Sequence, residues 1–522
     1  MSDPVAPSLT RRECLLAQLT PQTVYDIAIV GGGATGLGLA LDAASRGYRV
    51  VLVEADDFAK GTSSRSTKLV HGGVRYLAQG NLGLVREALS ERSTILSNAP
   101  HIAQPLPFVL PTYTGWEKAF YGIGLMLYDI LAGKSSLGKT AFLSQAEAVR
   151  CLPSVQTAGL CGGVKYWDGQ FNDAKLALAL ARTAARQGAL VLNYMQAVKL
   201  RYSEGKIAGI DCQDKLTGLV HEIQAACVVN ATGVWVDALR EQDGADQAMV
   251  TPSQGVHIVV DQKFLPGATG LMIPKTADGR VLFAVPWLGK VILGTTDTPR
   301  HDLPKEPLAL DAEIDFILNE SASYLRQAPT RDDVKSIWVG LRPLVTAPHQ
   351  AGKTTKDLSR EHTVLVSPSG MVTVTGGKWT TYRSMAEDVL RKCLAHRLIS
   401  FHQAAQTKHL KLVGAGDQAQ VSICEAEGLH SYGSEQHWVS TLPGNDVWLC
   451  EGLTEAMVRF AARYEYAITV EDVLARRSRL LFLDAKLAQT VAGRVGHILF
   501  EETGLDPKLQ EFLELSKRYS LM

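Results

Sequence analysis

The chain of 522 residues is longer than a single hydrophobic core usually supports, so two or three domains are expected. Its 53 basic residues balance 53 acidic residues, which excludes the overall positive field that nucleic-acid-binding proteins usually carry. The content of 46% hydrophobic and 20% charged residues suits a soluble globular protein, so an anionic ligand must be met by a local cluster of cations.

The eight cysteines are scattered, with no CxxC pair and no His/Cys group at metal-ligand spacing. We therefore expect reduced thiols, a cytoplasmic setting and no bound metal. Residues 1–22 are a polar extension with one short helical patch, Cys14–Leu19, and they lack the continuous apolar run of a secretory signal. No window of the chain reaches the ~20 apolar residues that a membrane-spanning helix needs.

A nucleotide-binding unit is predicted between residues 25 and 54. The short apolar strand Asp26–Val30 ends in three glycines at GxGxxG spacing, Gly31, Gly33 and Gly36. The first permits a tight turn, the second lets backbone N–H groups approach a pyrophosphate, and the third lets a helix over 34–46 pack close to the strand. A second strand, Arg49–Val53, delivers Glu54 where its carboxylate can accept hydrogen bonds from a ribose. A glycine turn in an ordinary α/β core is the alternative interpretation.

The next part of the chain contains a serine-rich loop over residues 61–76 and a helix marked by Leu82, Val85 and Leu89. A proline-punctuated section over 100–111 suggests that the chain leaves the first domain there. The segment Trp116–Leu131 is aromatic and apolar but is interrupted by charges. It fits a buried helix or hairpin of the core, or a surface element lying in a membrane interface.

Alternating elements continue with a helix over 173–187 and strands over 189–193, 205–212 and 226–232. In a β-rich region over about 251–300, HIVVD, RVLFAVPW and KVILGTTD are interpreted as neighbouring strands. A helix over 312–327 follows, with Asp311 as its N-cap.

From about residue 400 the pattern becomes helical. A helix over 469–481 is expected to begin with a capping box of Thr469 and Asp472. Three basic residues on that helix, Arg476, Arg477 and Arg479, are expected on a solvated face, with contact to anionic lipid as the alternative.

Two later segments favour FAD over NAD. Val228–Trp235 is a buried strand that runs into a glycine turn, as flavoproteins use where the chain returns beside the dinucleotide. Met371–Asp388 is a second strand, a Gly-Gly pair and a helix, whose N-terminus can face the flavin edge that becomes negative on reduction. A plain NAD dehydrogenase needs neither segment. The sequence therefore predicts an α/β fold with a Rossmann-like FAD-binding domain.

Over nearly its whole length the sequence resembles the FAD-dependent sn-glycerol-3-phosphate dehydrogenases of the aerobic, respiratory type. The resemblance is carried by IAIVGGGATGLGLALDAASRG, TSSRSTKLVHGGVRYLAQG, YWDGQFNDAKL, VVNATGVWV, GVHIVV, ILGTTDT, VGLRPLV, SREH and GGKWTTYR, and in the tail by YGSE and VEDVLARRSRLLFLDA. HGGVRYL and GGKWTTYR are the most specific of these motifs.

The resemblance implies an FAD-binding domain of the glycine/D-amino-acid oxidase type, a β-rich substrate domain and an all-helical C-terminal domain. We expect the FAD-binding domain to be discontinuous, over 23–95, 151–250 and 351–398. The substrate or cap domain, with a candidate membrane-contact segment, is expected over 96–150 and 251–350, and the helical domain over 399–522.

Binding of a glycerol phosphate without a metal calls for several cationic donors. By likeness to the family, the substrate and its phosphate are assigned to Tyr76, Arg342, Arg360 and Lys378, and Arg75 is placed close to the reacting hydroxyl. His71 and His257 are the candidate acceptors of the C2 hydroxyl proton, because a neutral imidazole titrates near the working pH. The alternatives are a surface role for Arg360 and a hydrogen-bonded core histidine at position 257. The expected cofactor-binding residues are Gly31, Gly33, Gly36, Glu54, Thr62, Ser63, Ser64, Gly233, Asp297, Gly376, Gly377 and Thr380.

The resulting hypothesis is a flavoenzyme that oxidises sn-glycerol 3-phosphate to dihydroxyacetone phosphate by hydride transfer to FAD N5. A membrane quinone is the expected electron acceptor, because the chain has no haem or iron–sulfur motif. The expected location is the cytoplasmic face of the inner (plasma) membrane, as a peripheral protein, or otherwise the cytoplasm; a homodimer is allowed. The alternatives are an oxidase that uses O2, a non-catalytic flavin-binding protein of the same fold, and an amine or amino-acid oxidase, which would need a carboxylate clamp.

Overall fold

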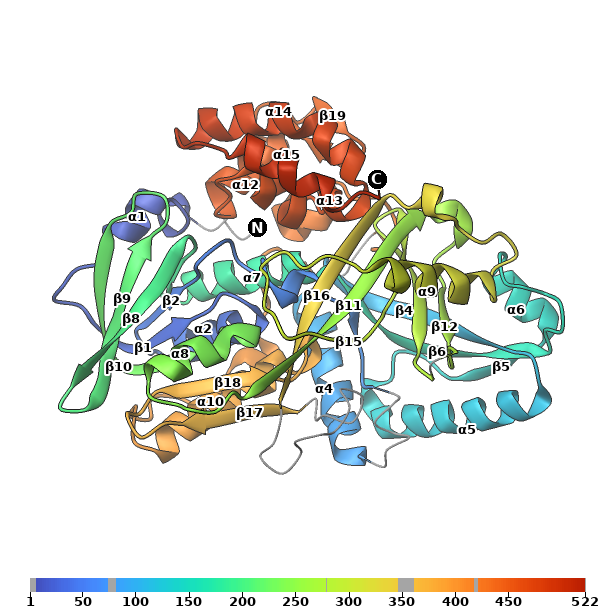
Figure 1. Cartoon of the computed structure of the whole chain (residues 1–522), viewed down its shortest axis with the longest axis horizontal. Helices are drawn as coiled ribbons and strands as arrows, with labels where there is room; N and C mark the ends of the chain where they lie inside the picture. Colours follow the sequence, from blue (N-terminus) through green and yellow to red (C-terminus); the bar gives the residue numbers. More distant parts are fainter. Residues whose placement is uncertain (1–5, 74–80, 278, 346–360, 417–420, 522) are drawn as a thin grey trace.

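The computed structural model describes residues 6–73, 81–277, 279–345, 361–416 and 421–521. Three of the expected site residues, Arg75, Tyr76 and Arg360, lie outside these ranges. Two large sheets lie side by side and form the body of the molecule, and the C-terminal helices lie on one side of it (Figure 1).

The first sheet carries the predicted nucleotide-binding unit at its centre. Its strand order is β17-β18-β10-β1-β2-β7, with β9 paired to β10 and β8 paired to β9. The strands are β1 (Val24–Val30), β2 (Val50–Val53), β7 (Leu190–Leu192), β8 (Met195–Ser203), β9 (Lys206–Asp214), β10 (Val220–Asn230), β17 (His362–Val366) and β18 (Val372–Gly376). Because β1, β2, β10 and β18 are parallel, their carboxyl ends meet at one edge, where such sheets bind ligands.

Helix α2 (Ala34–Ser45) follows β1 and packs between α7 (Asp173–Arg186) and α10 (Tyr382–Ala395). Its apolar residues are buried almost throughout, and its glycines set the spacing to its neighbours. A Cβ at Gly36 would lie 1.9 Å from the Gly31 carbonyl oxygen, and one at Gly38 would lie 2.5 Å from the Tyr382 ring. Only glycine at these positions lets the helix lie this close to β1 and α10.

The second sheet has the strand order β15-β11-β14-β13-β12-β4-β6-β3, with β16 paired to β11 and β5 paired to β6. Its strands are β3 (Leu69–Val70), β4 (Ala103–Thr112), β5 (Ala141–Leu143), β6 (Gly162–Phe171), β11 (Val250–Asp261), β12 (Gly270–Ile273), β13 (Leu282–Trp287), β14 (Lys290–Gly294), β15 (Thr298–Pro299) and β16 (Ser336–Val345). The predicted neighbours are confirmed, since β14 pairs with both β11 and β13. β6 belongs to this sheet, although residues 151–250 were expected in the FAD-binding domain.

Further helices surround the body, namely α1 (Arg12–Leu16), α4 (Leu82–Asn98), α5 (Gly115–Ala132), α6 (Gln145–Cys151), α8 (Val236–Gln242) and α9 (Asp311–Ala322). The N-cap of α9 is Leu310, and the expectation of Asp311 was wrong by one position. Among the helices of the described ranges, none combines the length and the apolar character needed to cross a bilayer.

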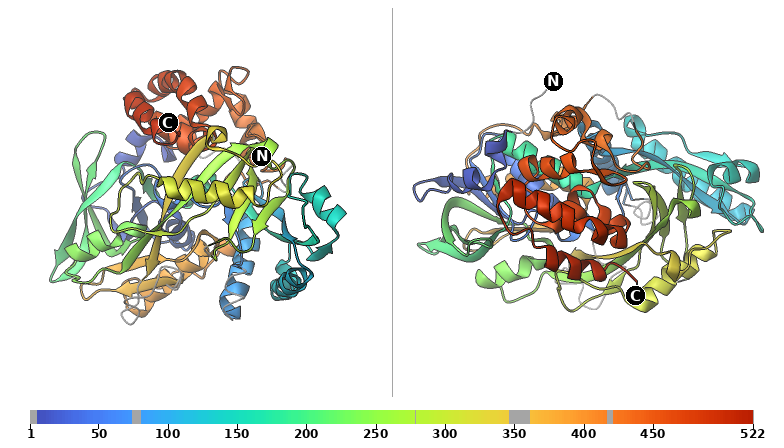
Figure 2. Two further views of the ribbon diagram at one scale, coloured as in Figure 1. Left: turned by 45° about the vertical axis from the view of Figure 1, so that its right-hand side comes forward. Right: turned by 90° about the horizontal axis from the view of Figure 1, so that it is seen from above.

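The C-terminal domain is helical and contains one short hairpin, β19 (Trp448–Cys450) with β20 (Leu453–Thr454). Its α-helices are α11 (Gln436–Ser440), α12 (Glu455–Tyr464), α13 (Leu480–Leu483), α14 (Ala485–Thr503) and α15 (Leu509–Lys517). Seen from above, these helices lie across the centre of the body (Figure 2). The domain therefore covers parts of the chain that are far away in sequence.

The segment expected as one helix over 469–481 is interrupted. Its predicted capping box is confirmed, since Asp472 N donates to Thr469 Oγ1 at 3.2 Å and Thr469 N donates to Asp472 Oδ2 at 2.9 Å. A π-helix, Asp472–Arg477, follows and ends before Arg479, whose φ is +61°. The expectation of a solvated face was wrong, because Arg476, Arg477 and Arg479 are all buried and bond to other parts of the chain.

Candidate active site

A cavity of about 700 Å³ opens at the carboxyl ends of β1, β10 and β18. It is lined by the glycine loop and neighbouring segments of the first sheet, and by side chains of β11, β13 and β16 from the second sheet. The glycine turns after β10 and β18, at Gly233 and at Gly376-Gly377, also line it. The cavity thus connects the nucleotide-binding unit with the β-rich part of the fold.

The glycine loop exposes backbone to this cavity. Gly31 has a φ of +113°, and a Cβ there would lie 2.5 Å from the Ala231 carbonyl oxygen, so the turn requires glycine. Gly33 is the N-cap of α2 and has no side chain with which to cap it. The first turn of α2 also has no acidic residue. Ala34 N donates to Ser63 Oγ, and the rest of the positive end of the helix is left for an anionic ligand such as a pyrophosphate.

Glu54 follows β2 and holds the loop beside it. Its Oε2 accepts from Gly32 N at 2.6 Å and its Oε1 accepts from Asp56 N at 2.9 Å. Burial raises the pKa of Glu54, and these two backbone donors oppose that effect. The carboxyl group therefore orients the glycine loop in addition to lining the cavity.

Arg342 on β16 is fixed in place by its neighbours. Its Nη1 donates to the Gln254 carbonyl at 3.2 Å and contacts Asp297 Oδ1 at 3.3 Å. Its Nη2 donates to Thr295 Oγ1 at 3.1 Å and to the Thr296 carbonyl at 2.9 Å. The side chain is still 23% exposed and lines the cavity. The guanidinium is thus preorganised at the wall of the cavity.

His257 on β11 lies in the same wall of the cavity and is buried. Its ring stacks on Trp338 at 5.2 Å between centroids, and its Nε2 lies 2.9 Å from Thr67 Oγ1. Burial, and then the charges of Lys68 and Arg342, hold the pKa of His257 well below its usual value. The imidazole is therefore neutral at ordinary pH, and the expectation that it titrates near the working pH was wrong.

Behind this wall lies a buried cation, Lys68. Its Nζ donates to Asp173 Oδ2 and to the Ser64 carbonyl, both at 2.7 Å. Burial lowers the pKa of Lys68 to about 7. Ser64 was expected to contact the cofactor, but it does not line the cavity and its carbonyl instead accepts from this lysine.

Most of the expected site residues within the described ranges come together around the cavity. They are Gly31, Gly33, Glu54, Thr62, Ser63, His71, Gly233, His257, Asp297, Arg342, Gly376, Gly377, Lys378 and Thr380. Gly36 lies beneath the loop, where it packs on Gly31, and not in the lining. The roles assigned to Arg75, Tyr76 and Arg360 stay predictions.

Thr67 and Lys305 are among the lining residues that were not anticipated. Thr67, the partner of His257, belongs to the motif TSSRSTKL that carried the resemblance, so its neighbourhood had been indicated. Lys305 reaches the cavity from the loop after β15 and pairs with Asp56 at 2.7 Å. Nothing in the sequence around Lys305 marks it as a site residue.

The lining fits a flavin dinucleotide. An open helix N-terminus and an acid after β2 suit the adenosine diphosphate half, and a Cβ at Gly233 would meet no atom within 4 Å, so backbone is left open there. The Gly376-Gly377 turn before α10 lines the same cavity as His257 and Arg342. The fold and this site define an FAD-dependent oxidoreductase.

Comparisons with known proteins specify the class further. The family model described as FAD dependent oxidoreductase matches residues 26–383, and that of the C-terminal domain of alpha-glycerophosphate oxidase matches residues 405–510. The mitochondrial glycerol-3-phosphate dehydrogenases of Homo sapiens and Arabidopsis thaliana are 40% and 38% identical. Each alignment covers 99% of this chain, and 76% and 90% of the respective relatives. The chain belongs to the family of FAD-dependent glycerol-3-phosphate dehydrogenases.

Solved structures agree with this assignment. The glycerol-3-phosphate dehydrogenase of Bacillus halodurans, solved in complex with FAD, has a TM-score of 0.78 at 28% identity, and the match covers 98% of both chains. An L-alpha-glycerophosphate oxidase of Mycoplasma pneumoniae has a TM-score of 0.57 at 16% identity over 74% of this chain and 98% of that one, which shows a shared fold. The predicted family, fold class and FAD cofactor are confirmed.

Proposed function

We propose that this protein oxidises sn-glycerol 3-phosphate to dihydroxyacetone phosphate and delivers the electrons to a quinone at a membrane surface. The observation that carries the substrate assignment is the meeting of Arg342, Lys378 and His257 around one cavity beside the glycine loop. Two cations and a neutral base are the groups that a phosphorylated secondary alcohol needs for its oxidation. FAD, when bound, supplies the hydride acceptor.

Arg342 is proposed to bind the phosphate. A guanidinium is a strong, permanently charged donor to phosphate oxygens, and here its position is fixed before the substrate arrives. Asp297 contacts it from one side, so it helps to fix the orientation of the guanidinium. Lys378 adds a second positive charge at the same cavity. Together these cations favour a phosphate over an uncharged polyol.

His257 is proposed to accept the proton of the C2 hydroxyl. As the O–H bond breaks, the C2–O bond becomes a carbonyl and the C2 hydrogen leaves with its electron pair. The low pKa of His257 means that it starts this step unprotonated, and Thr67 fixes the orientation of its ring. His71, which also lines the cavity, stays the second candidate.

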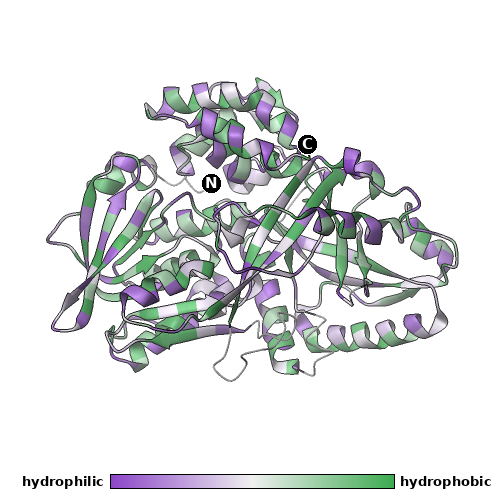
Figure 3. Ribbon diagram, in the orientation of Figure 1, coloured by the Kyte–Doolittle hydropathy of each residue, from purple (hydrophilic) through white to green (hydrophobic). Residues whose placement is uncertain are grey.

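Contact with a membrane is proposed for α5, which lies along one edge of the molecule (Figure 1). Apolar residues recur along its whole length (Figure 3). Trp116, Ile123 and Ile130 are 77%, 67% and 74% exposed, and Phe120 between them is also exposed. Neighbouring members of this set are four, three and seven positions apart, so they share a face of the helix. Leu125 and Tyr128 are buried against the body, and the exposed apolar face supports an interfacial role.

A flotation assay with anionic phospholipid vesicles tests this contact. The double variant Ile123→Glu, Ile130→Glu is expected to lose most vesicle binding, because two charges would enter the apolar interface. The control variant Leu219→Glu, Leu308→Glu changes two residues that are also exposed but lie elsewhere, and it should float like the wild type. Full binding by the α5 variant would contradict the proposal. Substitution of Leu125 would instead test folding, because that residue is buried.

The electron acceptor requires a separate experiment. Turnover with sn-glycerol 3-phosphate is measured in air, with and without a soluble quinone, while hydrogen peroxide is quantified. The proposal predicts that the quinone raises turnover and that little peroxide forms. One peroxide per substrate, with no gain from the quinone, would contradict it and indicate an oxidase.

A further inference from the structure

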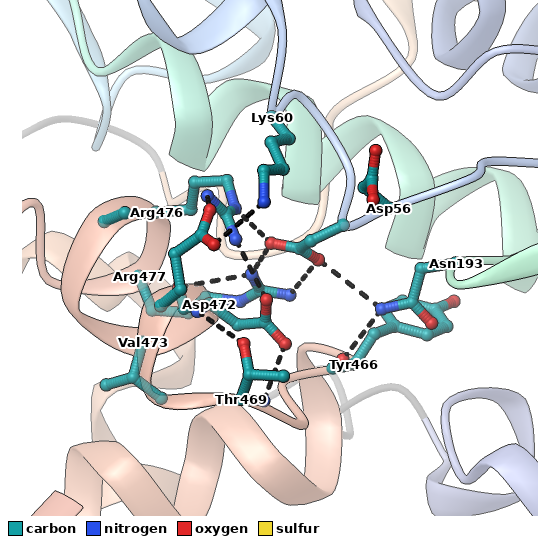
Figure 4. A network of polar contacts seen from close by, with 12 residues as sticks. Asp56, Lys60, Asn193, Tyr466, Thr469, Asp472, Val473, Arg476 and Arg477 are labelled. Atoms are coloured by element: carbon teal, nitrogen blue, oxygen red, sulfur yellow. Dashed lines mark hydrogen bonds and ion pairs between the residues drawn. The ribbon is translucent and has the colours of Figure 1, made fainter. Parts of the chain in front are cut away.

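The segment Glu471–Arg479 of the C-terminal domain lies against the loop Ala55–Ser64 of the nucleotide-binding unit. In Figure 4 the side chains of Arg476 and Arg477 reach from the C-terminal domain towards this loop, close to Lys60. The front of the same loop lines the cavity through Asp56, Ala59 and the run Lys60–Ser63. One face of the loop therefore meets the cofactor site while the other meets the C-terminal domain.

The first attachment is Asp57, which is fully buried. Its Oδ2 accepts from Arg476 Nε and from Arg477 Nη1, and its Oδ1 accepts from Arg477 Nη2 at 3.0 Å. Burial raises the pKa of Asp57, but Arg477 and Arg476 outweigh that effect and hold it below its usual range. Asp57 is thus a buried carboxylate whose charge is met by two consecutive arginines of the π-helix.

Two further attachments hold the rest of the loop. Lys60 Nζ lies 2.8 Å from Glu471 Oε2, and Arg479 Nη2 donates to the Ser64 carbonyl at 2.7 Å. Arg476 is itself held by Glu471 at 2.8 Å. Positions 57, 60 and 64 of the loop are therefore all fixed by one nine-residue segment.

The position of this loop also sets the position of the glycine turn. Ala59 N donates to the Gly32 carbonyl at 2.9 Å, and Ala34 N donates to Ser63 Oγ at 2.9 Å. Phe58 packs so closely on Gly32 that a Cβ there would lie 2.7 Å from its ring. A shift of the loop would therefore move the backbone groups that face a pyrophosphate.

We propose that Glu471–Arg479 is a positioning element for FAD, so that the attachment of this segment to the loop and the affinity for the cofactor are coupled. No residue of the segment lines the cavity, so it acts through the loop, including Lys60, which it pairs with and which lines the cavity. By linkage, a substitution that weakens the attachment must weaken FAD binding, and bound FAD must stabilise the attachment by the same factor. The proposal depends on the cofactor and not on the identity of the substrate.

The test compares FAD release from three purified holoprotein variants. Arg477→Met removes two hydrogen bonds to Asp57, and Glu471→Gln weakens the partly exposed pair with Lys60. The matched control is Arg182→Met, which breaks a buried bidentate pair with Glu435 at 2.6 and 2.7 Å. That pair also joins the body to the C-terminal domain, but neither residue lines the cavity.

Free FAD is measured by its fluorescence after dilution, well below the unfolding temperature, and Tm is measured with and without added FAD. Arg477→Met is expected to raise the Kd for FAD at least ~10-fold, and Glu471→Gln several-fold, within the usual range of coupling factors. The increase of Tm caused by FAD should shrink in both. Arg182→Met should lower both Tm values together and leave Kd unchanged.

The proposal is overturned if Kd stays within about twofold of the wild type in Arg477→Met and Glu471→Gln while their Tm falls, because a merely structural role predicts that result. An equal rise of Kd in Arg182→Met would overturn it as well. If Arg477→Met does not fold, Glu471→Gln alone decides, since the Glu471 side chain is 18% exposed and the buried Arg476 keeps Asp57 and Asp472 as partners.

Discussion

Replacing Arg342 by alanine is the most informative single change at the proposed substrate site. It removes the guanidinium that faces the cavity, and it leaves Asp297 with Ser253 as a remaining hydrogen-bond donor. The alanine side chain is smaller than the one it replaces, so no atom is forced against β11. The change should therefore act on substrate binding much more than on folding.

The magnitude follows from the contacts that a phosphate would lose. One hydrogen bond between charged groups contributes about 1.5–3 kcal/mol, which corresponds to a rise of KM of about 10- to 150-fold. The effect on folding should be smaller, about 1–2 kcal/mol, because the side chain is 23% exposed and its neighbours can bind water.

Steady-state kinetics with sn-glycerol 3-phosphate measure this change, and urea unfolding measures stability. The control is Arg331→Ala, which removes an exposed arginine paired with Asp311 and Asp315 and should leave KM unchanged. An unchanged KM in Arg342→Ala would refute the assigned role. A loss of stability as large as the loss of binding would refute it too.

Two further predictions concern the cofactor loop and the base. Gly36→Ala would place a Cβ 1.9 Å from the Gly31 carbonyl oxygen. It should therefore lower the free energy of unfolding by about 1–3 kcal/mol and weaken FAD retention. A free energy of unfolding in urea within about 0.5 kcal/mol of the wild type would contradict this. His257 has a pKa well below the ~6.5 of a free imidazole, so it stays neutral as the pH falls through that value. The decrease of kcat/KM at acid pH should therefore begin well below pH ~6.5. A decrease centred at that pH in the wild type and absent from His257→Asn would contradict the reasoning. The same low pKa affects stability. Below pH ~6.5 the unfolded chain takes up a proton at His257 and the native chain does not, so the free energy of unfolding decreases as the pH decreases. His257→Asn should make this pH dependence smaller.

The nucleotide-binding unit could be predicted because its signals are local. There are three such signals: a glycine at a positive φ, a glycine at a close helix–strand contact and an acid at a strand end. All three lie within about thirty residues, so the local backbone conformation alone requires these residue types. The capping box of Thr469 and Asp472 was found for the same reason, since its partners are three positions apart.

The arginines after that cap were misjudged because their partners are remote. Sequence shows that Arg477 is charged, but Asp57, which compensates the charge, lies 420 positions earlier in the chain. A basic run on an amphipathic pattern usually faces water, and only the fold brings this carboxylate to it.

Strand β4 was missed because Pro105, Pro107 and Pro111 suggested only that the chain leaves the first domain there. They occupy alternate positions, so their missing N–H groups all fall on one side of the strand. β12 pairs with β4 only at Phe108 and Val109, whereas β6 pairs along its whole length. The prolines are therefore tolerated as they are at a sheet edge.

The central claim is that cations around the FAD site select a phosphorylated alcohol for oxidation. The direct test is anaerobic titration of the holoprotein with sn-glycerol 3-phosphate and, separately, with glycerol, while the visible flavin absorbance is recorded. The phosphate ester should bleach the flavin at one equivalent, and glycerol should leave it oxidised at the same concentration. Equal bleaching by glycerol, or no bleaching by its phosphate, would contradict the claim.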